Sequence, residues 1–151
     1  MKIYRLANVK FDFVSTDDEP PEGVDLGNVW KVFDNAEINP SRSKDITDIA
    51  TVDGRIVGST VSSWQPGEDD EMVFSFDIAV EKEFRGMMVG PRLIERAIKE
   101  YNYGKDVYVE MGMKPIMRVE VVNMKLSRFM IKHYGFIVDR ELPDRVYLSK
   151  E

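Results

Sequence analysis

The sequence predicts a mixed α/β or α+β domain, in which helices flank a central sheet. Three observations lead to this fold class. Segments rich in β-branched and aromatic residues come in pairs joined by turn sequences, and two further segments have the hydrophobic spacing of amphipathic helices. The content of 43% hydrophobic and 32% charged residues is that of a folded soluble protein. At 151 residues, we expect a single domain spanning 1–151.

The first third of the chain combines one weak strand, one loop and one clear hairpin. Residues 2–15 alternate loosely and could form an edge strand, while the acidic, proline-rich residues 16–27 indicate a loop. Residues 28–37 have the spacing of a short helix. Residues 46–52 and 55–64 are β-rich and flank the dipeptide "DG", which is a strong hairpin signal.

The middle of the chain predicts a strand that leads into a helix. After a turn in 65–71, residues 72–80 alternate with the period of a strand. One face carries Phe74, Phe76, Ile78 and Val80, and the other carries Ser75, Asp77 and Ala79. A helix is predicted over about 91–102, followed by an irregular connection over 104–115.

The last third predicts a strand, a helix and a closing hairpin. The strand is expected at 116–122 and the helix at about 124–134. Residues 135–142 and 145–150 are separated by "PD" and indicate two further strands. These elements complete a sheet with helices inserted between its strand pairs.

Composition narrows the range of functions. The formal charge of −6 disfavours nucleic acid as a partner and favours cationic ligands. The alternative is that the acidity serves only solubility. The chain has no cysteine and one histidine, His133, so the sequence predicts no metal site and no thiol nucleophile. No apolar run has the length of a membrane helix and no signal-peptide core is present, so we expect no membrane association and a cytoplasmic location.

The stretch "EFRGMMVGPRLIERAIKEY" connects the central strand to the predicted helix and can bind an anion. Pro91 suits a first helical turn, where a missing N–H costs little. The N–H groups and positive dipole end of a helix N-terminus attract anions, and glycines permit close approach of a ligand. Arg92 and Arg96 lie one turn apart and could reach phosphate oxygens. The alternative is a plain strand-to-helix connection with two solvated arginines.

This stretch resembles the phosphate-binding signature of the GNAT acetyltransferase superfamily, [Q/R]-x-x-G-x-[G/A]. In "IAVEKEFRGMMVGPRLI", Arg85 takes the first position and Gly90 the last, whereas Met88 stands where the family has its middle glycine. The hairpin "TVDGRIVGST" and the segment "NMKLSRFMIKHYGF" are also similar to GNAT segments and follow in family order. The resemblance implies a mixed, mostly antiparallel central sheet of six or seven strands, splayed at the acetyl-CoA site.

The resemblance also implies acetyl-CoA as acyl donor and an amine as acceptor. The positions that match the family's cofactor site are Ile78, Ala79, Val80, Arg85, Gly86, Met87, Met88, Val89, Gly90, Pro91, Asn123 and Ser127. Asn123 could equally be a helix N-cap. The acceptor pocket would draw on about 17–45 and 103–116. Many relatives dimerise, so a homodimer is compatible with the resemblance.

The catalytic groups are less clearly marked. The family's tyrosine acid would fall at Ile131, and Tyr134 is the nearest substitute. Asp77, on the strand that leads to the phosphate loop, and Glu120, on the strand before Asn123, are candidate bases, although either could instead form an ordinary ion pair or face solvent. Two functions follow from the resemblance: an N-acetyltransferase acting on an unidentified primary amine, or a catalytically degenerate module that binds CoA or a protein partner.

Overall fold

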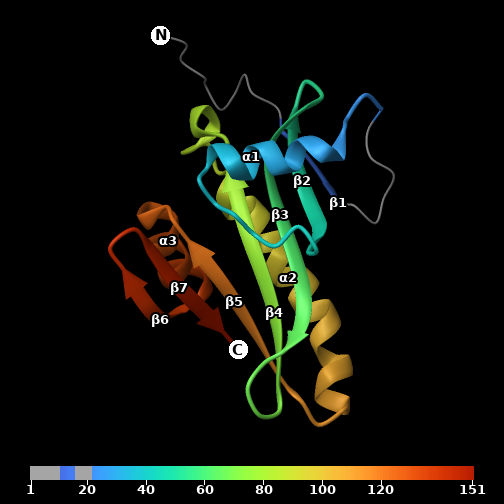
Figure 1. The fold of residues 1–151 in the computed structure, drawn as a ribbon, viewed down its shortest axis with the longest axis vertical. Coiled ribbons are helices and arrows are strands. Elements are labelled where there is room, and N and C mark those ends of the chain that lie inside the picture. The colour runs from blue at the N-terminus through green and yellow to red at the C-terminus, as the bar shows by residue number, and fades with distance from the viewer. Residues whose placement is uncertain (1–10, 16–21) are drawn as a thin grey trace.

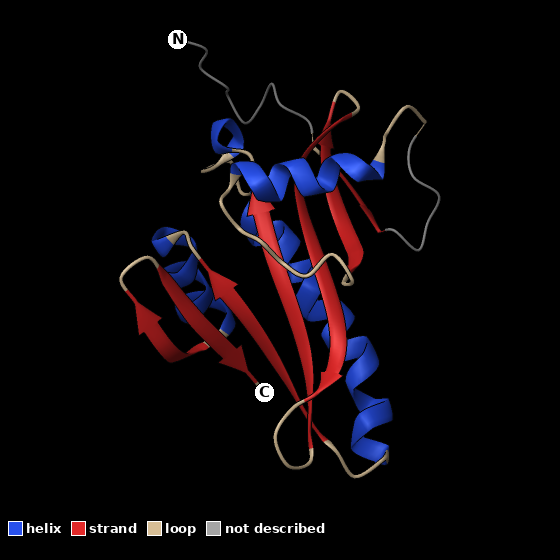
Figure 2. Cartoon of the chain, viewed as in Figure 1, coloured by secondary structure: helices blue, strands red, loops and turns tan. Residues whose placement is uncertain are grey.

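The computed structural model describes residues 11–15 and 22–151, and within them the chain forms one seven-stranded sheet flanked by three α-helices (Figures 1 and 2). The sheet order is β1-β2-β3-β4-β5-β7-β6. Among the described strands, β4 and β5 are the parallel pair and every other neighbouring pair is antiparallel. The predicted mixed, mostly antiparallel sheet is therefore confirmed.

The N-terminal half supplies the antiparallel part of the sheet. The strands are β1 (Asp12–Ser15), β2 (Asp45–Val52), β3 (Arg55–Pro66) and β4 (Glu71–Val80). In the β2–β3 turn, Asp53 and Gly54 both have positive φ, 51° and 77°. Such angles are those of the tight hairpin turns that "DG" favours. The predicted hairpin is confirmed, while residues 1–10 of the expected edge strand and 16–21 of the expected loop lie outside the described residues.

The C-terminal half adds β5 (Lys114–Val121), β6 (Ile137–Leu142) and β7 (Arg145–Lys150). Helix α3 (Met124–Tyr134) lies between β5 and β6. Its ends follow the sequence closely, because the Asn123 side chain accepts hydrogen bonds from the N–H groups of Lys125 and Leu126 at 3.0 and 3.2 Å. Gly135 closes the helix in the left-handed conformation, at φ 74°.

The two faces of the sheet are covered by different helices. Alternate residues of β4 pack under helix α2 (Val89–Glu110) and α3 in the larger core, among them Phe74, Phe76 and Ile78. Helix α1 (Val29–Asn35) packs on the opposite face in a smaller core that includes Ala79. As Figure 1 shows, α1 crosses one end of that face, and the face over β5, β7 and β6 carries no described helix.

Helix α2 is longer than the sequence predicts, and the prediction of an irregular segment from 104 was wrong up to Glu110. Gly104 suggests a helix end because glycine is a poor helix former. In the fold, a Cβ at Gly104 would lie 3.2–3.4 Å from three atoms of the Trp64 ring. Trp64 also packs against Tyr101 and Tyr108, with ring centroids 5.6 and 4.7 Å apart. The glycine admits the indole to the helix surface, and aromatic packing offsets its low propensity.

Gly58 of β3 has a comparable role beneath the start of α2. A Cβ there would lie 3.1 Å from both Leu93 Cδ1 and Val89 Cγ1 and 3.3 Å from the Ala79 carbonyl oxygen. The absence of a side chain lets α2 approach the sheet closely, which sets the position of the helix N-terminus.

Replacing Gly58 by valine should lower the free energy of unfolding by about 1–3 kcal/mol, because added methyl groups overpack this contact. Urea unfolding measures the loss. Gln65→Val inserts the same side chain at an exposed position of β3 and should change stability by less than about 0.5 kcal/mol. Equal effects of the two substitutions would contradict the close packing inferred at Gly58.

Candidate functional site

A gap between β4 and β5 dominates the candidate site. The two strands pair from Glu71 and Lys114 up to Phe76 and Val119, and then separate although β4 continues to Val80 and β5 to Val121. Figure 1 shows the strands diverging towards the end where α2 and α3 begin. Backbone groups of β4 beyond Phe76 that face the gap therefore have no β5 partner among the described residues.

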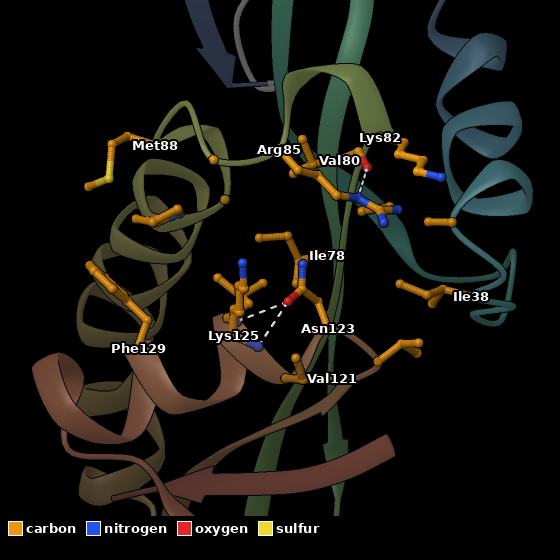
Figure 3. A pocket seen from close by; sticks show the side chains of 17 residues that line it. Ile38, Ile78, Val80, Lys82, Arg85, Met88, Val121, Asn123, Lys125 and Phe129 are labelled. Atoms are coloured by element: carbon orange, nitrogen blue, oxygen red, sulfur yellow. Dashed lines mark hydrogen bonds between the residues drawn. The ribbon is translucent and has the colours of Figure 1, made fainter. Parts of the chain in front are cut away.

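A cavity of about 600 Å³ opens at this gap. Its size is that of a small-molecule site. The lining comes from the end of β4, the following loop, the starts of α2 and α3, the end of β5 and the segment after α1 (Figure 3). The lining residues are Ala36, Ile38, Ile78, Ala79, Val80, Lys82, Arg85, Gly86, Met88, Gly90, Pro91, Val121, Val122, Asn123, Lys125, Leu126 and Phe129.

The N-terminus of α2 forms one wall of the cavity. Val89 and Gly90 occupy the first turn, and the first backbone hydrogen bond of the helix runs from Arg92 N to the Met88 carbonyl oxygen at 3.2 Å. N–H groups before this point have no acceptor within the helix, so the positive end of α2 is directed at the opening. Pro91 falls in this first turn as predicted, although the helix begins two residues earlier, at Val89.

The backbone conformation of Met88 explains why the family has a glycine at this position. Met88 is the N-cap of α2 and lies in the left-handed region, at φ 65° and ψ 12°. Side chains other than glycine adopt this conformation at a cost of about 1–2 kcal/mol. The methionine is 48% exposed, and in Figure 3 it lies at the edge of the site, apart from Arg85 and Asn123. Here methionine and glycine therefore differ chiefly in backbone strain.

Three cations border the cavity: Lys82, Arg85 and Lys125. The described residues that line it include no carboxylate. Arg85 donates from Nε to the Val80 carbonyl oxygen at 3.0 Å, which folds its guanidinium over the end of β4 (Figure 3). Positive side chains together with a helix N-terminus make this wall of the cavity favourable for a phosphate-bearing ligand.

Comparison with solved structures identifies the fold. Arabidopsis thaliana Naa50, in complex with the bisubstrate analogue CoA-Ac-MVNAL, aligns over 95% of this chain and 98% of its own at 14% identity and a TM-score of 0.58. The Salmonella typhimurium protein yncA, a putative acetyltransferase with acetyl-CoA, aligns over 95% and 93% at 14% identity and a TM-score of 0.58. Protein PH1933 of Pyrococcus horikoshii aligns over 94% and 98% at 14% identity and a TM-score of 0.62.

The chain has the GNAT acetyltransferase fold. No protein-family model matches its sequence, and comparison with curated proteins finds no significant match. The likeness therefore lies in the arrangement of the elements, at an identity of 13–15%.

Most of the residues that the GNAT resemblance assigns to the cofactor lie together at the cavity. They are Ile78, Ala79, Val80, Arg85, Gly86, Met88, Gly90, Pro91 and Asn123. The lining does not include the described residues Met87, Val89 and Ser127. Met87 packs against the larger core and Val89 is buried in it, while the buried Ser127 hydroxyl donates to the Met124 carbonyl oxygen at 3.0 Å.

Several lining residues were not anticipated from the sequence. Lys125 and Phe129 lie within two turns of the Asn123 cap, so helical spacing from that residue could have suggested them. Ile38 comes from the segment after α1, and no local pattern indicates its position. Arg92 and Arg96, which were expected to reach phosphate, line a different cavity. Arg96 Nε donates to Asp48 Oδ1 at 2.8 Å, and Arg92 stacks 5.1 Å from the centre of the Phe13 ring.

The two candidate bases meet in another cavity, which is called the second cavity below. It lies on the face of the sheet where β5, β7 and β6 carry no described helix. Asp77 and Glu120 are each the first residue beyond the last β4–β5 pair, and both line this cavity of about 430 Å³. Lys44 Nζ lies 2.8 Å from Asp77 Oδ2, and Arg145 pairs with Glu120. Both carboxylates are thus ion-paired. Of the regions expected to form an acceptor pocket, residues 17–45 contribute Ile38, Asn39, Pro40, Ser41 and Lys44 to its lining, and the described lining includes no residue of 103–116.

Tyr134 is directed towards α2. Its hydroxyl lies 2.8 Å from Glu95 Oε1 and 3.4 Å from the Pro91 carbonyl oxygen. Burial, with the hydrogen bond to Glu95, raises the pKa of Tyr134 above its ordinary range. The described residues that line the two cavities do not include it. Tyr134 therefore holds α3 against α2 in this structure.

Replacing Met88 by glycine should raise the free energy of unfolding by up to about 1 kcal/mol, because relief of left-handed strain exceeds the added freedom of the unfolded chain. Met88→Ala is the matched control, since alanine keeps the strain, and it should bring no gain. Urea unfolding of the three proteins measures the difference. A gain with alanine equal to that with glycine would contradict the assignment of strain to this residue.

Proposed function

We propose that this domain is an acetyl-CoA-dependent N-acetyltransferase whose acceptor is a primary amine. The observation that carries the proposal is the cavity in the β4–β5 gap, which is lined by Lys82, Arg85 and Lys125 and by the first turn of α2. The solved structures with a CoA analogue or acetyl-CoA support it, because the chain shares their fold over nearly its whole length.

In this proposal the pyrophosphate of the cofactor lies against the first turn of α2. The amides of Val89 and Gly90 and the three cations offset its charge. The pantetheine arm lies in the gap and hydrogen-bonds to backbone groups of Ile78–Val80, which have lost the β5 partner that the preceding residues retain. Ile78, Val121 and Phe129 provide apolar contact.

The acceptor would enter from the opposite face. Ile38 lines both cavities, so they adjoin at this residue. Asp77 directly follows the last paired residue of β4, which puts the second cavity at the narrow end of the gap. An amine held there attacks the thioester carbonyl carbon, the C–S bond breaks, and the departing thiolate takes up a proton. Asp77 or Glu120 would accept the proton of the amine.

The ion pairs favour a second candidate function, a GNAT-fold module that binds CoA without turnover. Asp77 and Glu120 are engaged by Lys44 and Arg145, and the Tyr134 hydroxyl is engaged by Glu95. Catalysis by positioning alone remains effective in a preorganised site, so turnover by the first candidate is compatible with these contacts.

Acetyl-CoA should raise the melting temperature of the protein. A ligand at 100 times its Kd adds about 2.7 kcal/mol, which corresponds to a shift of roughly 5–10 °C for a domain of this size. Gly90→Tyr should abolish the shift, because a Cβ at Gly90 would already lie 3.4 Å from Leu126 and the ring would enter the cavity. Lys99→Tyr places the same residue at an exposed position of α2 and should leave the shift unchanged. Absence of a shift in the wild-type protein would refute both CoA-binding functions.

Thiol release distinguishes the two candidate functions. We expect free CoA thiol to form when a panel of amines, including peptide N-termini and lysine side chains, is added with acetyl-CoA. Asp77→Asn and Glu120→Gln should each be assayed, and the substitution that removes the base should lower kcat at least tenfold with little effect on acetyl-CoA binding. Binding of acetyl-CoA without thiol release on any amine would support the non-catalytic module.

A further inference from the structure

A partly buried primary amine lies against Asp77, at the narrow end of the β4–β5 gap. Lys44 is the residue before β2, and its Nζ lies 2.8 Å from both Asp77 Oδ2 and Ser75 Oγ. The side chains of Lys44 and Asp77 are 13% and 9% exposed. Most lysines remain largely solvated, so an ammonium held inside a cavity wall is unusual.

The strand register places this amine at the narrow end of the β4–β5 gap. Phe76 and Val119 are the last paired residues, and Asp77 is the first residue of β4 beyond them. A cofactor bound with its phosphates at α2 and its arm along Ile78–Val80 runs towards Asp77, so its thioester end approaches the carboxylate that holds Lys44. Ser75 and Asp77 point to the face where the second cavity lies, and Lys44 lines that cavity.

We propose that Lys44 is a self-acetylation site, modified by the acetyl-CoA bound to the same molecule. This inference rests on the proposed binding of acetyl-CoA. The amine needs no diffusional encounter because the fold holds it in the wall of the second cavity, which shares Ile38 with the cofactor cavity, and such placement can replace a high concentration of external amine. The flexible four-carbon stem of lysine permits the remaining movement from Asp77 to the thioester.

The reaction balances with the groups present. The Lys44 ammonium gives one proton to the Asp77 carboxylate, which passes it to solvent, and the neutral Nζ attacks the acetyl carbonyl carbon. A C–N bond forms, the C–S bond breaks, and its electron pair leaves with sulfur. The second proton of the nitrogen goes to the thiolate. The products are N-acetyl-Lys44, free CoA and one released proton.

Acetylation would change the second cavity. The amide carries no charge, so the ion pair with Asp77 is lost and its carboxylate becomes available to an incoming amine. Self-acetylation would therefore convert a site closed by an internal lysine into one with an available base.

Mass spectrometry tests the inference directly. The purified chain is incubated with acetyl-CoA and no acceptor, and the sites of acetylation are mapped over time. We expect Lys44 to be acetylated first, ahead of the exposed Lys31 and Lys99, because unassisted chemical acetylation follows exposure and would label those two first. Labelling of the exposed lysines ahead of Lys44 would overturn the proposal.

Variants separate the mechanism from nonspecific modification. Lys44→Arg keeps the positive charge but removes the amine, so the fast acetylation should disappear while acetyl-CoA still raises the melting temperature. Asp77→Asn should slow acetylation at Lys44 at least tenfold without changing the labelling of Lys31. An unchanged rate in Asp77→Asn would contradict the role given to the carboxylate.

A mixing experiment tests whether the transfer is intramolecular. Gly90→Tyr retains Lys44 and is expected to bind no cofactor, so Lys44 of this variant should stay unlabelled even when it is mixed with active wild-type protein. Acetylation of Lys44 in this variant would refute the intramolecular route. If acetyl-CoA raises the melting temperature of the wild type and Lys44 stays unmodified, the inference fails and the proposed function stands. If acetyl-CoA does not bind, both fail.

Discussion

The loss of pairing between β4 and β5 beyond Phe76 and Val119 is the constraint on which the site depends. In a parallel pair both strands end at the same edge of the sheet, so the elements that follow them begin there together. Helix α2 follows β4 after a short loop and α3 follows β5 almost directly. The divergence brings both helix N-termini to one opening and exposes backbone groups of β4 that an uninterrupted sheet would have used.

Packing of α2 on the sheet holds this opening in place. Gly58 lets the start of the helix approach β3, and Gly104 receives the Trp64 ring further along. In both contacts a neighbouring side chain occupies the space that a side chain on the glycine would need. The contacts therefore fix the position of the helix as well as stabilise it. The N-terminus of α2 is directed at the gap because these distant contacts orient the helix.

Electrostatics divide the two faces of the gap. On the α2 side, cations border a cavity whose described lining has no carboxylate, whereas the opposite face carries Asp77 and Glu120, each with a basic partner. The pair between Lys44 and Asp77 is largely buried, and such pairs are costly to desolvate and add little net stability. Its position at the narrow end of the gap therefore gives it more significance for chemistry than for folding.

Local sequence patterns were sufficient to predict most of the helices and strands. The "DG" hairpin, the alternation in β4 and the Asn123 cap of α3 depend on neighbours a few residues away, which is why they could be predicted. The end of α2 could not, because Gly104 is tolerated through contact with Trp64, forty residues earlier in the chain. The motif match also assigned Val89 and Ser127 to the cofactor site. In the structure the Val89 side chain is buried in the core, and the Ser127 hydroxyl donates to a backbone carbonyl oxygen.

The sequence by itself determined the glycine-containing loop, the helix that begins after it and the positions of the candidate carboxylates. The tertiary structure alone decided which of these face a common space. Lys44, Asp77 and Glu120 lie on three separate segments, and only the register of the sheet brings them to the end of one gap. Arg92 and Arg96 show the converse, because the orientation of α2 directs them to Phe13 and Asp48, away from the gap. Side-chain direction depends on how each element packs, and that packing is set by contacts between residues far apart in the chain.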